Sequence, residues 1–181
     1  MTTLPTPRRV LAVMAHPDDI EFMAGGMISR WARLGVELHY CLLTDGNSGS
    51  RDPSLTPAVL AELRRAEQRA AGALFNVSSY SFLGRTDGRL VADIDLRVAI
   101  AREIRRVRPD TVVTCDPSFF YGPNYINHPD HRAAAEATLA AAEAPEEALY
   151  AAYNIGAGHP MTILAMARAL ARALGVDIEP N

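Results

Sequence analysis

Two short polar clusters in this sequence of 181 residues carry side chains that could bind a metal ion. The first, at 15–19, is Ala-His-Pro-Asp-Asp, and the second, at 128–131, is His-Pro-Asp-His. Imidazole and carboxylate groups are suitable zinc ligands, and a neighbouring carboxylate can activate the water that the metal binds. Three ligands drawn from the two clusters would leave one position open for water, which is the pattern of a catalytic zinc site.

Each cluster also has a purely structural interpretation. Asp18 or Asp19 could cap the helix predicted from Ile20, with His16 in a structural role, and Asp130 could cap the helix that begins there. Taken alone, the first cluster leaves both interpretations open. Two clusters of the same pattern at one predicted edge of a sheet favour a catalytic metal site over coincidence.

The elements that must position these clusters alternate between strand and helix. Val10–Ala15 is a continuous apolar run, which is typical of a strand buried on both faces. Helices at this spacing between strands predict an α/β fold with a mostly parallel sheet and helices on both faces. The further strands are predicted at 36–44, 77–83 and 111–115, and the helices at 20–34, 57–75, about 93–108 and about 130–143.

Ionisable residues collect at the predicted carboxyl ends of the strands, where parallel sheets bind their ligands. Asp45 and Asp116, at two of these ends, are expected to orient ligand imidazoles from behind, or else to cap turns. Asp130 is assigned the same orienting role. His39 lies inside a predicted strand and is expected to be structural. The residues at these ends are His16, Asp18, Asp19, Asp45 and Asp116.

The composition excludes several classes of function. All 18 basic residues are arginine, so this chain cannot form a lysine Schiff base or use a Walker-type phosphate lysine. A net charge of −3 gives no basic surface for a nucleic acid or an anionic membrane, so we expect a small-molecule substrate. With 49% hydrophobic residues, the chain can form one domain with a buried core.

The cysteines and the N-terminal residues bear on the cellular compartment. Cys41 and Cys115 lie inside apolar runs and are expected to be buried thiols rather than a disulfide or a metal pair. The first apolar stretch ends at Ala15, which is too short for a signal peptide or a membrane span. We therefore expect a cytoplasmic protein.

The two histidine clusters together resemble the LmbE-like, or N-acetylglucosaminyl-phosphatidylinositol de-N-acetylase, family over about residues 8–143. The resemblance implies a Rossmann-like fold of three layers. It also implies a zinc-dependent hydrolase that removes the acetyl group from an N-acetylglucosamine-type amino sugar or its conjugate. Weaker landmarks in the same order are Thr44-Asp-Gly46, Arg64-x-x-Glu67, Thr86-Asp-Gly88 and Arg108-Pro-Asp110.

The resemblance also implies roles for individual residues. His16, Asp19 and His131 would bind one zinc ion per chain. Asp18 would be the general base on the water, and His128 would stabilise the oxyanion or protonate the leaving amine.

The resemblance also bears on substrate contacts. Arg64 and Asp87 match family positions that contact sugar hydroxyls, although a surface salt bridge and a turn are equally open interpretations. The aromatic loop at 119–125 could stack on a sugar or close over it, or could simply pack.

The family pattern ends after about Glu147. Residues 153–181 resemble a C-terminal fragment of an extended short-chain dehydrogenase/reductase epimerase, or else supply the protein's own covering helix. The predicted domains are thus a shortened deacetylase domain at 1–148 and a divergent helical tail at 149–181. No Gly-x-Gly-x-x-Gly follows an early strand, which argues against a complete dinucleotide site.

Two other functions deserve comparison with the hydrolase. A truncated or chimeric chain could be a catalytically weak metal- or sugar-binding domain, and apolar surface left by a shortened sheet would favour a homo-oligomer. Alternatively, the aspartates at the strand ends could hold Mg²⁺ for phosphoryl transfer. The paired histidines argue against that, because Mg²⁺ prefers an all-oxygen shell.

Overall fold

Four parallel strands form the central sheet of residues 6–143, the part of the chain that this computed structural model describes. Their order is β3-β2-β1-β4, so β1 lies inside the sheet. The carboxyl ends of all four strands therefore meet at one edge. The predicted strands are confirmed, with ends shifted by one or two residues: β1 (Arg9–Met14), β2 (Glu37–Thr44), β3 (Ser79–Arg85) and β4 (Thr111–Val113).

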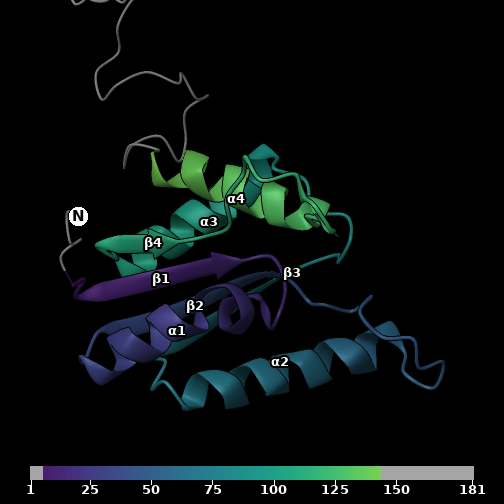
Figure 1. Ribbon diagram of the computed structural model, residues 1–181, viewed down its shortest axis with the longest axis horizontal. Helices are drawn as coiled ribbons and strands as arrows, with labels where there is room; N and C mark the ends of the chain where they lie inside the picture. Colours follow the sequence, from purple (N-terminus) through teal and green to yellow (C-terminus); the bar gives the residue numbers. More distant parts are fainter. Residues whose placement is uncertain (1–5, 144–181) are drawn as a thin grey trace, which may run out of the picture. The chain divides into compact units, whose positions relative to one another are not determined.

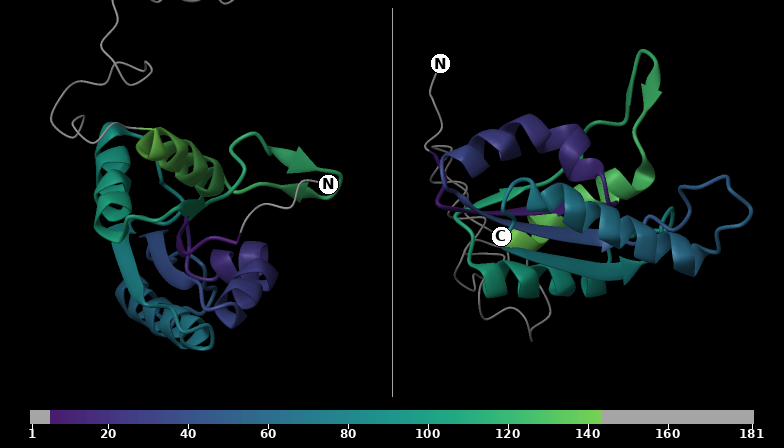
Figure 2. Two further views of the ribbon diagram at one scale, coloured as in Figure 1. Left: turned by 90° about the vertical axis from the view of Figure 1, so that its left-hand side faces the viewer. Right: turned by 90° about the horizontal axis from the view of Figure 1, so that it is seen from below.

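Helices cover both faces of this sheet and complete three layers (Figures 1 and 2). One face carries α1 (Asp19–Arg33) and α2 (Pro57–Ala73), and the other carries α3 (Ile94–Val107) and α4 (Pro129–Ala142). The α/β fold predicted from the alternation is therefore confirmed. The loop before α4 also contains an unpredicted antiparallel hairpin, β5 (Tyr121–Gly122) and β6 (Tyr125–Ile126). Strands of two residues are too short to show a periodic pattern.

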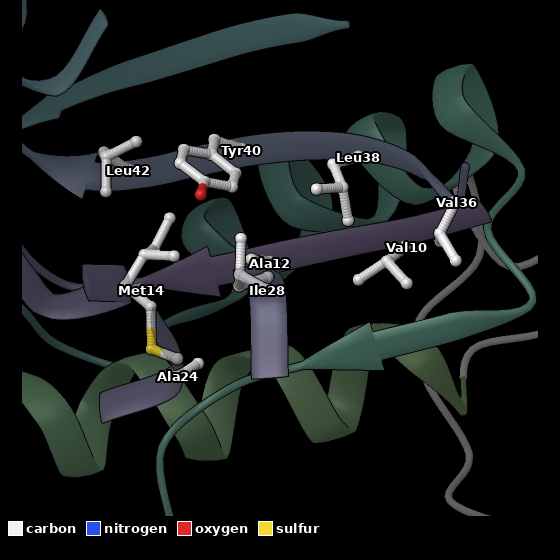
Figure 3. Close-up of a cluster of buried hydrophobic side chains, with 10 residues drawn as sticks. Val10, Ala12, Met14, Ala24, Ile28, Val36, Leu38, Tyr40 and Leu42 are labelled. Carbon is white, nitrogen blue, oxygen red and sulfur yellow. The ribbon is translucent and has the colours of Figure 1, made fainter. Parts of the chain in front are cut away.

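The main core lies between β1, β2 and α1, as Figure 3 shows. Alternate residues of a strand point to the same face, so every second side chain of β1 and β2 enters this core. From α1, Ile20, Ala24 and Ile28 recur every four residues and form one buried stripe. The intervening residues of β1 are buried too, as expected for a strand covered on both faces. The strand residues of this cluster are Val10, Ala12, Met14, Leu38, Tyr40 and Leu42.

The end of β1 is tied to the end of β2. The backbone N–H and the hydroxyl of Thr44 both donate to the carbonyl of Ala15, at 2.8 and 2.9 Å. These two hydrogen bonds to one carbonyl fix the point where the chain leaves the sheet, immediately before His16. The first polar cluster therefore starts from a rigid position.

Several expectations concern other parts of the chain. Both cysteines are free: Cys41 is buried and Cys115 is partly buried. Between residues 6 and 143, no helix is both long enough and apolar enough to cross a membrane. The expected domain boundary at 148 and the epimerase-like tail at 149–181 lie outside the described residues.

Replacing Ile28 by alanine should destabilise the fold by about 2–5 kcal/mol, because the side chain is fully buried between α1 and the sheet. Urea denaturation followed by circular dichroism measures the change in the free energy of unfolding. Met27 is the matched control: it is the preceding residue of the same helix but is 41% exposed, so Met27→Ala should cost less than about 1 kcal/mol. Equal losses in the two variants would contradict this packing.

Candidate metal centre

The two histidine clusters come together at the carboxyl edge of the sheet. His16 lies in the turn between β1 and α1, and His128 and His131 lie at the start of α4. The ring centroids of His16 are 4.8 Å from those of His128 and 5.2 Å from those of His131. The convergence predicted from the strand ends is therefore what the fold produces.

The carboxylate of Asp19 joins two of these imidazoles. Its Oδ1 is 3.1 Å from Nε2 of His131, and its Oδ2 is 3.2 Å from Nδ1 of His16. The same Oδ2 accepts the backbone N–H of His16 at 2.8 Å. Asp19 is buried, so both contacts are shielded from solvent. Three of the predicted metal ligands thus face one another through a single carboxylate.

The second ring nitrogen of His131 is held by Asn127. Nδ1 of His131 donates to the side-chain carbonyl of Asn127 at 2.9 Å. The amide of Asn127 in turn donates to the backbone carbonyl of Phe119 at 2.8 Å, which fixes which end of the amide faces the histidine. A neutral His131 therefore carries its proton on Nδ1 and presents the Nε2 lone pair to Asp19.

The second ring nitrogen of His16 faces two more carboxylates. Nε2 is 3.1 Å from Oδ1 of Asp87 and 3.3 Å from Oδ2 of Asp130. Asp130 is itself fixed, because its two oxygens accept the backbone N–H groups of Gly88 and Leu90 at 2.8 and 3.1 Å. Asp130 thus lies where a carboxylate can orient His16.

The N-terminus of α4 is capped by a histidine and not by the Asp130 carboxylate, which was the structural interpretation of this cluster. The residue at the N-cap is His128, whose Nδ1 accepts the backbone N–H of Asp130 at 3.2 Å. The Asp130 carboxylate does not cap this helix, because it is occupied by His16 and by the turn after β3. A neutral His128 therefore carries its proton on Nε2 and can donate it.

The surrounding charges shift the protonation of these groups. Burial disfavours a charged His16, but Asp130, Asp19 and Asp87 outweigh it and raise the pKa of His16 to about 10. Burial likewise opposes the ionised form of Asp19, but hydrogen bonds from His131 and His16 hold its pKa well below the ordinary value. At neutral pH the metal-free cluster thus holds a proton between His16 and its carboxylates.

The donor set fits a cation. Nε2 of neutral His131 and Oδ1 of Asp19 are both acceptors at 3.1 Å, so their contact needs a proton or a metal ion between them. In the described part of the chain, two groups of side chains have donor atoms close enough to share one ion: His16 with His128 and His131, and His16 with Asp87 and Asp130. Asp19 contacts two members of the first group.

Among residues 6–143, the carboxylate of Asp18 has no hydrogen-bond or ion-pair partner. Asp18 stands at the N-cap of α1 with a φ of 102° and makes no capping hydrogen bond through its side chain. The capping alternative is therefore wrong for Asp18. Partial desolvation and the charge of Asp19 raise the pKa of the Asp18 carboxyl above its ordinary value. Asp18 and Arg64 line the same cavity of about 110 Å³.

Other predicted site residues make different contacts. Asp87 contacts His16 and accepts the backbone N–H of Ser48 at 3.0 Å, so one of its oxygens orients an imidazole. Arg64 forms a salt bridge with Glu67 at 2.9 Å, which is one of the two interpretations that the sequence left open for it. Asp45 pairs with Arg65 at 2.7 Å.

Asp116 and the aromatic loop lie beside the cluster. Asp116 caps a turn, accepting the backbone N–H and the hydroxyl of Ser118 at 2.8 and 2.6 Å. Phe119 and Tyr125 stack with centroids 6.0 Å apart and line a cavity of about 510 Å³ together with Asp116. His39 is bonded to Ser79 within the sheet, which supports its structural role.

Several known proteins are similar to this chain in sequence and in fold. The family model described as PIG-L, GlcNAc-PI de-N-acetylase, matches residues 11–142. The chain is 33% identical over 125 residues to diacetylchitobiose deacetylase of Thermococcus kodakarensis, covering 69% of this chain and 45% of that one. It is 35% identical over 169 residues to 1D-myo-inositol 2-acetamido-2-deoxy-alpha-D-glucopyranoside deacetylase of Kineococcus radiotolerans, covering 76% and 45%.

Solved structures are also similar to this chain. N,N'-diacetylchitobiose deacetylase of Pyrococcus horikoshii superposes with a TM-score of 0.70 at 32% identity, covering 75% of this chain and 49% of that one. The hydratase GalB of Pseudomonas putida gives 0.64 at 29%, covering 74% and 55%. The chain thus spans about half the length of the curated relatives it matches. Because the family model covers most of the sequence, the chain belongs to the PIG-L (GlcNAc-PI de-N-acetylase) family.

Proposed function

We propose that this protein is a zinc-dependent deacetylase that hydrolyses the N-acetyl group of an N-acetylglucosamine-type amino sugar or its conjugate. The observation that carries the proposal is the Asp19 carboxylate shared by His16 and His131, with the Asp18 carboxylate uncommitted beside it. Relatives named as deacetylases of diacetylchitobiose and of a GlcNAc-inositol support the substrate class.

His16, Asp19 and His131 would hold the ion. Nδ1 of His16, Nε2 of His131 and the carboxylate of Asp19 already converge, and the outer nitrogen of each ring is fixed by Asp87, Asp130 or Asn127. Such outer partners orient the ligand rings and raise their basicity. A bound zinc ion would supply Lewis acidity, which activates water and polarises the amide carbonyl.

Asp18 and His128 would carry the proton transfers. The uncommitted carboxylate of Asp18 would take the proton of the attacking water as the general base. His128 would donate from Nε2, either to the oxyanion or to the leaving amine, because its Nδ1 is occupied by the backbone N–H of Asp130. Arg64, in the same cavity as Asp18, would contact sugar hydroxyls.

Zinc binding should release at least one proton per chain at pH 7, because His16 has a pKa of about 10 and must lose its Nδ1 proton to act as a ligand. His16 is protonated below about pH 10, and this proton competes with zinc, so zinc affinity should rise with pH across the neutral range. Titration calorimetry in two buffers with different ionisation enthalpies measures the released proton.

The same titration needs matched variants. His131→Ala should lose the zinc, whereas His39→Gln should keep about one zinc per chain, because His39 is bonded within the sheet. Full zinc content in His131→Ala would contradict the assigned ligands.

Asp18→Asn should lower kcat by about 10²–10⁴-fold, because the amide cannot take a proton from water. The zinc content should stay unchanged, since Asp18 is outside the proposed ligand set. Release of acetate from N,N'-diacetylchitobiose measures the rate. Asp52→Asn is the control, because that exposed carboxylate bonds to Ser54. Zinc binding without turnover in the parent chain would instead favour a catalytically weak binding domain.

A further inference from the structure

A buried glutamine connects α2 to the start of α1. Gln68 is 2% exposed. Its Oε1 accepts the backbone N–H of Asp18 at 2.9 Å, and its Nε2 donates to Oε1 of Glu21 at 2.9 Å. One side-chain amide thus bridges the peptide of Asp18 to the first turn of α1.

The peptide that Gln68 binds is in an unusual conformation. Asp18 has a φ of 102°, in the left-handed region that side chains with a Cβ rarely adopt. Its own side chain makes no capping bond that would compensate. Such a conformation persists only where its surroundings hold it. The bond from the Asp18 N–H to Gln68 is a contact that does so.

The bridge uses both ends of the glutamine amide. A glutamate at this position could accept from Asp18 but would face Glu21 with a like charge. A methionine has a similar length but can neither accept nor donate in the same way. Among the described residues, Oε2 of Glu21 is buried without a hydrogen-bond partner, so the bond from Gln68 to the other oxygen matters for keeping Glu21 in place.

We propose that Gln68 is a positioning residue that, through the peptide of Asp18, aims the Asp18 carboxylate for proton transfer. The inference rests on the proposed function of Asp18 as general base. The hydrogen bonds of Gln68 go to Asp18 and Glu21 and not to the imidazoles. Its removal should therefore misplace the base while leaving the metal ligands in position.

A double-mutant cycle tests this role. Gln68→Met is made in the parent chain and in Asp18→Asn, and both are loaded with zinc and assayed with N,N'-diacetylchitobiose. In the parent chain kcat should fall by about 10–100-fold, since a small misplacement of a reacting group has effects of this size, while KM changes less than about threefold. In Asp18→Asn the same substitution should cause little further loss, because the group it positions is already gone.

The control is Tyr40→Phe, which alters a buried polar group of the core between β1, β2 and α1 (Figure 3). The Tyr40 hydroxyl is without a hydrogen-bond partner among the described residues, so this variant should keep the parent kcat. A loss of equal size in both backgrounds of the cycle would overturn the proposal, because it would show a general structural role instead.

Hydrogen exchange separates this inference from the proposed function. If the parent chain hydrolyses no amide, the deacetylase proposal fails, yet the bridge is still measurable. Exchange of the Asp18 amide should then be at least about tenfold faster in Gln68→Met than in the parent chain, with zinc binding retained. Unchanged protection of that amide would overturn the positioning role whether or not the chain is active.

Discussion

The contact between Asp19 and two imidazoles is the interaction on which the site depends. With its proton on Nδ1, a neutral His131 would face Asp19 through a lone pair, so a proton or a metal ion between the two makes this contact favourable. His16 meets the same carboxylate through its other ring nitrogen. The buried cluster therefore selects for a cation, whether a proton or a metal ion. The remaining polar contacts at this edge keep the rings turned towards that position.

The fold supplies this arrangement by ending strands at one edge. β1 is internal to the sheet, and the carbonyl of Ala15, directly after β1, accepts two hydrogen bonds from Thr44 of β2, so His16 starts from a fixed point. The turn after β3 brings Asp87 to His16 and offers two backbone N–H groups to Asp130. Burying several carboxylates is unfavourable unless each is paired, and here each has a histidine or backbone donors. Backbone N–H groups of a loop far away in sequence thus stabilise negative charge at the site.

Much of the fold and of the site could be predicted from the sequence. The contacts that could not be predicted depend on tertiary packing or have no distinctive spacing in the sequence. Between residues 6 and 143, apolar runs and helical spacing predicted the four strands of the main sheet and the four helices, and the paired histidine clusters predicted which side chains converge at its carboxyl edge. The contact of Asp87 with His16 was not predicted, because the direction of a turn residue depends on tertiary packing. Asn127 and Gln68 were missed, since an amide in a loop or a helix has no distinctive spacing. Asp116 follows its local sequence and caps a turn.

Asp130 serves two imidazoles through chemically different parts of the residue. Its carboxylate faces His16, whereas its backbone N–H sets the proton position on His128. Side-chain substitutions at 130 alter only the first of these links, because every residue except proline keeps the N–H. The properties of the proposed metal ligand and of the proposed proton donor can therefore diverge independently during evolution, even though both depend on one position in the chain.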